Sequence, residues 1–153
     1  MTATRFPAVA GLFYPADAWQ LEQDVRHLLA SARLYDFKPK ALIVPHAGYV
    51  YSGAVAATAY ASLRAVAPII QRVVLLGPAH RVAVHGLALP GVDVFDTPLG
   101  HVKLDADLVN VIAHLPQVTI HRETHALEHS LEVQLPFLQT VLSDFTLLPL
   151  VVG

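Results

Sequence analysis

The chain contains no cysteine, and it has only one methionine and one tryptophan in 153 residues. Without cysteine it can form no disulfide of its own and offers no thiolate to a metal ion. Metal ligands, if there are any, must therefore come from its nine histidines or its carboxylates. The absence of cysteine fits a reducing compartment, and we expect a cytoplasmic protein.

Charge of either sign is also scarce, at 14% of the residues against about 25% in an average globular protein. The net charge of −2 gives no basic field that would attract nucleic acid or an anionic membrane. The sequence shows no apolar run long enough to span a bilayer and no signal-peptide core near Met1. We expect neither nucleic acid nor membrane as a partner. The 54% share of hydrophobic residues indicates that some apolar surface faces a partner, such as a second copy of the chain.

Hydrophobic periodicity predicts alternating helices and strands. Apolar residues at helical spacing predict helices over 18–32, 54–67, 106–115 and 128–142, and short apolar runs predict strands over 41–44, 72–76, 84–90, 92–95, 118–121 and 145–152. Asp17, Ser52 and Asp105 are the expected N-caps, Gln20 is placed to complete a capping box, and Pro136 is expected to interrupt the last helix.

The expected architecture is one α/β domain over residues 1–153, with a mostly parallel sheet flanked by helices. The runs 84–90 and 92–95 are broken by Pro90-Gly91 and are expected to form an antiparallel excursion from that sheet. The final run, 145–152, is apolar on both faces, and no helix follows to cover it. We expect the missing cover to come from another chain, or the sequence to be a fragment of a longer domain.

Two histidines follow the same local pattern. Pro45 stops the run 41–44 just before His46, and Gly77-Pro78 stops the next strand just before His80. Open α/β sheets bind ligands at the carboxyl ends of their strands, so the two imidazoles are placed to converge on one ion of Zn, Fe, Cu or Ni. Either histidine alone is better explained by a hydrogen bond to backbone at a strand end, and it is the repetition of the pattern that favours a shared site.

The segment His125–Gln134 holds a second group of candidates. His129 could act as a general acid or base, and Glu128 could orient a histidine or be a third metal ligand. Glu128 and Glu132 lie one turn apart and could share a helix face. The alternative is that the acidic residues complement a helix N-terminus while His129 is a surface residue. Tyr49 and Tyr51 could line a pocket or belong to the core.

Several motifs, in order along the whole chain, together resemble the Memo-like protein family (AmmeMemoRadiSam system protein B). They are Pro7–Pro15, Pro45–Gly53, Gly77–His80, Thr97–Gly100, Glu128–Leu138 and Pro149–Gly153. The family is similar in fold to the catalytic subunit of class III extradiol ring-cleaving dioxygenases, which hold Fe(II) by two histidines and a carboxylate. The resemblance implies that His46 and His80 bind the metal and that His129 lies in the pocket beside it.

The resemblance also sets expectations beyond these residues. Family members continue past the point where this chain stops, with an S-S-D-x-x-H-type motif and a cysteine that complete the metal site, so the chain resembles the N-terminal part of the family domain. Some members resemble redox metalloproteins and others resemble adaptors with a vestigial pocket, while bacterial members often accompany radical-SAM proteins.

The leading interpretation is a metal-binding, Memo-like redox protein related to non-haem iron dioxygenases. His46 and His80 would be the ligands, His129 the acid/base, and Tyr49 and Glu128 part of the substrate pocket. The expected metal is Fe(II), with Cu or Zn as alternatives, and the partner is an unidentified small molecule or peptide. One alternative is a non-catalytic module that binds a protein or peptide beside a vestigial metal pocket. Another is a Zn hydrolase with Glu128 as third ligand.

Overall fold

The structure is a computed structural model that describes residues 2–153. In chain order its elements are β1 (Thr4–Arg5), α1 (Ala18–Ala30), α2 (Tyr49–Ala61), β2 (Arg72–Pro78), β3 (Leu87–Leu89), β4 (Val94–Thr97), β5 (Gly100–Lys103), α3 (Ala106–Ile112), β6 (Val118–Ile120), α4 (Arg122–Ala126), α5 (Leu135–Val141) and β7 (Thr146–Val152). Short 3₁₀ helices follow α2 (Ser62–Ala65 and Ala67–Ile69) and precede α5 (Glu132–Gln134).

The strands of residues 2–153 form two mixed sheets. The larger has the order β2-β7-β3-β6, in which β2 with β7 and β3 with β6 run parallel while β3 and β7 run antiparallel. The smaller has the order β1-β4-β5, with β4 and β5 joined as a hairpin whose turn lies between Thr97 and Gly100. The expected α/β fold class is confirmed.

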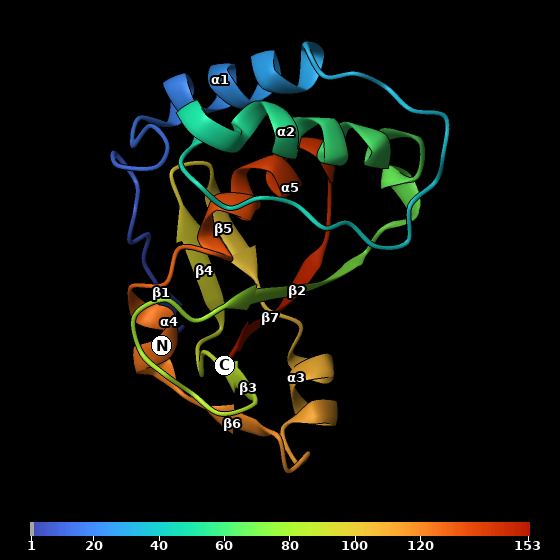
Figure 1. Cartoon of the computed structure of the whole chain (residues 1–153). Coiled ribbons are helices and arrows are strands. Elements are labelled where there is room, and N and C mark those ends of the chain that lie inside the picture. Colours follow the sequence, from blue (N-terminus) through green and yellow to red (C-terminus); the bar gives the residue numbers. More distant parts are fainter. Residues whose placement is uncertain (1) are drawn as a thin grey trace.

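The two faces of the larger sheet are covered unequally. Helices α1, α2 and α5 lie together on one side of the strands, and the short α3 lies on the other (Figure 1). Leu147 of β7 faces the main core beneath α2 and α5 and is fully buried. Its neighbour Leu148 points to the opposite face, where it packs with Leu108 and Ile112 of α3. The sheet therefore has helices on both faces only where α3 covers it, and elsewhere it is covered on one face alone.

Local sequence signals set several helix starts correctly. The Asp17 carboxylate accepts a hydrogen bond from the Gln20 amide at 2.8 Å, and Asp105 accepts one from the Leu108 amide at 3.0 Å. Two of the three expected N-caps, Asp17 and Asp105, are confirmed, whereas Ser52 is not the cap of its helix. The Gln20 side chain donates to Asp24 instead of closing a capping box. The interruption expected at Pro136 is also confirmed, because α5 begins anew with this proline in its first turn.

The strand predicted over 41–44 is wrong. This segment has no regular secondary structure in the described chain, and the side chain of Ile43 is fully exposed, at 102% of its reference area. A strand needs a neighbour to satisfy its backbone groups, and β2, the nearest parallel candidate along the chain, pairs only with β7 among the described residues. The apolar run therefore has the composition of a buried strand but, in the described part of the chain, no neighbouring strand to form hydrogen bonds with it.

Three other boundaries also differ from the predictions. Helix α2 begins at Tyr49 with Gly48 as its N-cap, so Ser52 lies within the helix and its hydroxyl donates to the Ala47 carbonyl. The runs 84–90 and 92–95 do not pair with each other, because β3 and β4 belong to different sheets. The helix predicted from Glu128 begins only at Leu135, as α5, since residues 127–131 are non-helical and connect α4 to the 3₁₀ turn before α5.

The final strand is better covered than its sequence suggested. Strand β7 lies between β2 and β3, and its residues from Leu147 to Val151 are buried. Its cover comes from helices that precede it in the sequence, so the expectation that β7 lacks cover within the chain is wrong. In this sheet, the most exposed large apolar side chains lie instead on the two edge strands, at Val74 and Leu76 of β2 and Ile120 of β6. Among residues 2–153, no helix is both long and apolar enough to cross a membrane.

Candidate metal centre

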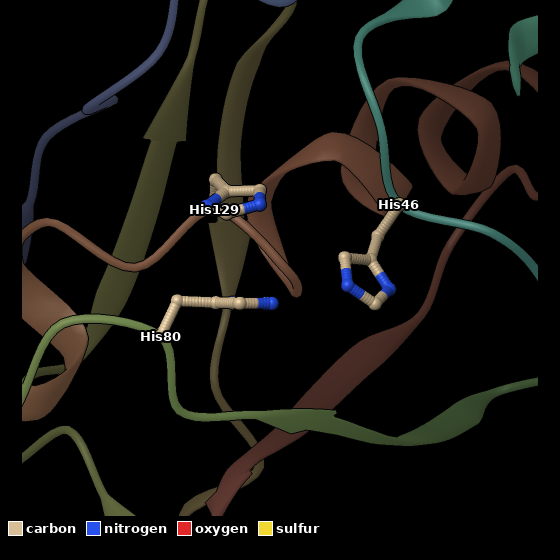
Figure 2. A group of neighbouring side chains, drawn as sticks. All are labelled: His46, His80 and His129. Atoms are coloured by element: carbon tan, nitrogen blue, oxygen red, sulfur yellow. The ribbon is translucent and has the colours of Figure 1, made fainter. Parts of the chain in front are cut away.

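Three histidines from distant parts of the chain face one another. His46 precedes α2, His80 follows β2, and His129 lies in the loop between α4 and α5 (Figure 2). The ring centroids are 5.1 Å apart for His46 and His80, 4.6 Å for His80 and His129, and 5.9 Å for His46 and His129. One imidazole nitrogen from each residue lies within 4.8 Å of the other two. The predicted convergence of His46 and His80 is therefore confirmed.

The loop that carries His46 is held by side chains rather than by a sheet. The Pro45 carbonyl accepts a hydrogen bond from the Gln134 side-chain amide at 3.1 Å. On the other side of His46, the Ala47 carbonyl accepts one from the Ser52 hydroxyl at 3.2 Å. Anchoring the carbonyls on both sides fixes the path of the loop, so that the imidazole reaches the other two without a strand behind it.

His80 is fixed by a buried carboxylate. Its backbone amide donates to Oε2 of Glu128 at 2.6 Å, and its ring nitrogen Nδ1 lies 2.9 Å from Oε1 of the same residue. Because a carboxylate accepts hydrogen bonds, Nδ1 carries the proton in this contact, which leaves Nε2 as the ring atom that can face a metal ion. A histidine held in this way by a carboxylate is ordered as a metal ligand requires.

Glu128 uses both its oxygens inside the protein. It is 2% exposed and also accepts hydrogen bonds from the backbone amides of His129, at 2.8 Å, and Ser130, at 2.9 Å. Burial alone raises the pKa of Glu128, but the hydrogen bonds from Ser130, His80 and His129 outweigh it and lower the pKa to about 2. The residue is thus a charged carboxylate that orients the two histidines. Its contact with a substrate stays a prediction.

His129 is packed between two rings. It stacks on His80 with an angle of 25° between the ring planes, and its centroid lies 4.7 Å from that of Phe13. Burial lowers the pKa of His129. The pKa of His46 is also lowered, by burial and by the neighbouring His80 ring. Both imidazoles are therefore neutral at pH 7 and can offer a lone pair.

The donor set fits a transition-metal ion. Neutral imidazole suits Zn, Cu, Fe and Ni. With metal–nitrogen bonds of about 2.0–2.1 Å, two ligand nitrogens on one ion can be at most about 4.2 Å apart. The observed limit of 4.8 Å for the three nitrogens is only slightly larger, so small side-chain rotations bring them into range. His46, His80 and His129 are the residues that could hold the ion.

Of the two tyrosines predicted near the site, Tyr49 packs against the core and Tyr51 is exposed. The Tyr49 hydroxyl donates to the Val133 carbonyl at 2.7 Å, and its ring centroid is 5.0 Å from that of Phe137 in the core. Tyr51 is 85% exposed. Tyr49 therefore supports the start of α2, where the His46 loop ends, and its contact with a substrate stays a prediction.

The sequence analysis missed a close contact between β2 and the His129 loop. The Ser130 hydroxyl donates to the Pro78 carbonyl at 3.0 Å, and a Cβ atom added at Gly77 would lie 2.6 Å from that hydroxyl. Only glycine permits this approach. The sequence predicts a strand stop at Gly77-Pro78, but β2 extends through both residues, and nothing in the immediate sequence of Gly77 indicates the distant Ser130.

A buried ion pair anchors the same loop from behind. The Arg5 guanidinium pairs with Glu132 and donates to the backbone carbonyls of His125 and Glu128. Glu132 is fully buried and also accepts a hydrogen bond from the Tyr14 hydroxyl at 2.6 Å. The prediction that Glu128 and Glu132 share a helix face is wrong, because α4 ends at Ala126. The Glu128 carboxylate binds His80 and the loop amides, whereas the Glu132 carboxylate binds Arg5 and Tyr14.

These features define a mixed α/β protein with three histidines gathered beyond one end of β2. The family model described as "Memo-like protein" matches residues 5–153, nearly the whole chain. The chain belongs to the Memo-like protein family.

The relatives are longer than this chain. A MEMO1 family protein of Aquifex aeolicus is 42% identical over 149 residues, which cover 97% of this chain and 54% of the relative. One from Ignicoccus hospitalis is 41% identical over 96% of this chain and 55% of its own length. One from Pyrobaculum arsenaticum is 39% identical over 97% of this chain and 56% of its own length. The chain thus spans about half the length of these relatives.

Proposed function

We propose that the chain binds a divalent transition-metal ion through His46 and His80, and that His129 faces the ion as an acid/base. The observation that carries this proposal is the approach of three imidazole nitrogens to within 4.8 Å of one another, with His80 held by Glu128. The proposed class is a redox metalloprotein related to non-haem iron dioxygenases. Membership in the Memo-like family supports it, because three of the motifs that resemble the family carry these histidines, namely Pro45–Gly53, Gly77–His80 and Glu128–Leu138.

The proposed metal is Fe(II), with Cu or Zn as alternatives. Imidazole ligands accommodate all three ions, so the donor set alone does not decide between them. When bound with open coordination positions, Fe(II) supplies sites for substrate oxygen atoms and for dioxygen. The similarity of the family to extradiol dioxygenases is the reason for placing iron first.

The proposed proton carrier is His129. Its Nδ1 lies 3.4 Å from Glu128, whereas the Nδ1 of His80 lies 2.9 Å from the same carboxylate. The carboxylate therefore holds the ring of His129 less tightly than the ring of His80. Because burial lowers its pKa, it is neutral at pH 7 and can accept a proton from a substrate hydroxyl close to the metal.

An anaerobic Fe(II) titration tests the metal site. The chain would be loaded, desalted and assayed for bound metal beside its His46→Ala and His80→Ala variants, with Cu and Zn in parallel. We expect bound metal near one ion per chain, lost in both variants. His101→Ala is the control, because His101 is 66% exposed and pairs with Asp96 on the small sheet. Unchanged binding in the two variants would refute the site.

Oxygen uptake with a catechol tests the proposed chemistry separately. The Fe(II)-loaded chain should consume oxygen, and His129→Gln should lower the rate by about 10²–10⁴-fold while metal content is retained. Loss of metal in this variant would instead make His129 a third ligand. Hydrolysis of an ester with Zn but not with Fe(II) would favour a hydrolase.

The second candidate is a non-catalytic module that binds a protein or peptide, and the exposed apolar residues of β2 favour it. This function would be supported if the chain binds a protein or peptide equally well with His46→Ala or His80→Ala and does not turn over a catechol. A cytoplasmic location, homo-oligomers and association with radical-SAM system proteins are further proposals. Co-purification of a tagged chain with such a protein, compared with a His46→Ala chain, tests the last of these.

A further inference from the structure

Strand β2 leaves one edge of the larger sheet open. It is seven residues long and pairs with β7 on one side, while none of the described residues pairs with it on the other. Such an edge presents unpaired backbone N–H and C=O groups and is a template for another strand. The edge runs toward His80, the residue that faces the metal site.

One face of the same strand is apolar and uncovered. Val74 pairs in register with Leu148 and Leu76 with Leu150, so these four side chains point to the same face of the sheet. The two β7 residues are each 4% exposed, in the cluster that includes residues of α3. Val74 and Leu76 are 53% and 56% exposed. Helix α3 thus covers β7 and stops short of β2.

A second apolar segment lies open beside the site. Residues 41–44 have the composition of a buried strand but form none. Leu42 and Val44 pack against the main core, and Ile43 is fully exposed. This segment leads into His46, just as β2 leads toward His80, and the two rings lie 5.1 Å apart. Both apolar segments therefore end at the metal centre.

The relatives contain polypeptide that could occupy this surface. The chain matches 54%, 55% and 56% of three relatives, so a little under half of each lies outside the match. A family domain of that length has further apolar residues to bury, and the matched half offers an open strand edge with an apolar face to receive them.

We infer that the open edge of β2, with Val74, Leu76 and the 41–44 segment, binds a polypeptide equivalent to the part of the relatives outside the match. The bound polypeptide adds a strand to the edge and covers the two apolar side chains. This mode of recognition uses main-chain hydrogen bonds for affinity and side-chain pockets for specificity.

Binding in trans is the first test. The probe is the segment of the Aquifex aeolicus relative that lies outside the match, purified and added to the chain in light-scattering and titration experiments. We expect a one-to-one complex that Leu76→Lys weakens at least tenfold. Val111→Lys is the matched control, since Val111 is also an exposed apolar residue, 61% exposed on α3. Circular dichroism of both variants would check that the free chains remain folded.

Binding in cis is the second test, and it does not depend on a soluble probe. The same segment is joined after Gly153 through a flexible linker, and hydrogen exchange of the β2 amides is compared with that of the chain alone. We expect slower exchange on β2 and a higher Tm, both reversed by Leu76→Lys and kept by Val111→Lys. Two results would overturn the inference. The first is that the chain alone forms a dimer and that Leu76→Lys dissociates it. The second is that hydrogen exchange of the β2 amides is unchanged in the fused chain and that the separate segment forms no complex with the chain.

Discussion

Glu128 holds His80 through two of that residue's groups, the backbone amide at 2.6 Å and the ring nitrogen Nδ1 at 2.9 Å. The same carboxylate accepts the backbone amide of His129 at 2.8 Å. One buried charge therefore sets the positions of two of the three imidazoles. The geometry of the candidate metal site depends on this residue even though Glu128 need not touch the ion.

Glu128→Gln should weaken metal binding by about 10–100-fold, because an amide cannot accept all four hydrogen bonds that the carboxylate receives. Competition with a chromophoric chelator would measure the affinity. Glu123→Gln is the control, since Glu123 is 76% exposed. An affinity within twofold of the unmodified chain would show that Glu128 does not position the ligands.

Arg5→Met should destabilise the fold by about 3–5 kcal/mol, because it leaves the Glu132 carboxylate buried without its ion pair. Urea unfolding would measure the change. The matched control is Arg26→Met, which breaks an exposed pair with Glu22 and should cost less than about 1 kcal/mol. Equal losses in the two variants would mean that the buried pair does not anchor the loop.

Gly77→Ala should cost about 1–3 kcal/mol and weaken metal binding, because the added methyl group would meet the Ser130 hydroxyl and displace the loop that carries His129. Thermal unfolding and metal titration would measure the two effects. Adding Ser130→Gly removes the nearest obstacle and should restore part of both. A double variant no better than Gly77→Ala would assign the damage to Leu131, whose side chain lies 2.8 Å from the added atom.

His125 should make the stability depend on pH. Burial lowers its pKa to about 4 from the 6.5 of an unperturbed histidine, and its Nε2 donates to the Ala88 carbonyl at 2.7 Å. Between these values the unfolded chain binds a proton that the folded chain does not, so stability falls as the pH drops from about 6.5 to about 4. The loss amounts to about 3 kcal/mol.

His125→Gln keeps a donor near the Ala88 carbonyl without a titrating group. Urea unfolding at several pH values should show that this variant loses the part of the pH dependence that lies between about 4 and 6.5. His114→Gln serves as the control, because His114 is an exposed histidine near the end of α3. A pH profile unchanged by His125→Gln would place the titrating group elsewhere.

Features that depend on local chemistry could be predicted from the sequence. Asp17 and Asp105 cap their helices as predicted, because an N-cap needs only its own carboxylate and an amide three residues later. The approach of His46 to His80 was also predicted, although one of the two strands invoked for it does not form. Gln134 and Ser52 hold the His46 loop in place of that ladder.

Features that depend on distant partners could not be predicted. Ile43 lies in a run that resembles a buried strand, but strand formation requires a neighbour that the sequence alone does not reveal. Arg5 and Glu132 are 127 residues apart, and nothing near either residue indicates the other. The loop between α4 and α5 adopts its path to satisfy such contacts, so the helical periodicity from Glu128 onward was misleading.

The most direct test of the metal centre is a crystal structure of the Fe(II)-loaded chain with anomalous data collected at the iron edge. The proposal predicts one strong anomalous peak about 2.0–2.2 Å from a ring nitrogen of both His46 and His80, with His129 facing it. A fully loaded crystal whose only peak lies away from these histidines would contradict the proposal.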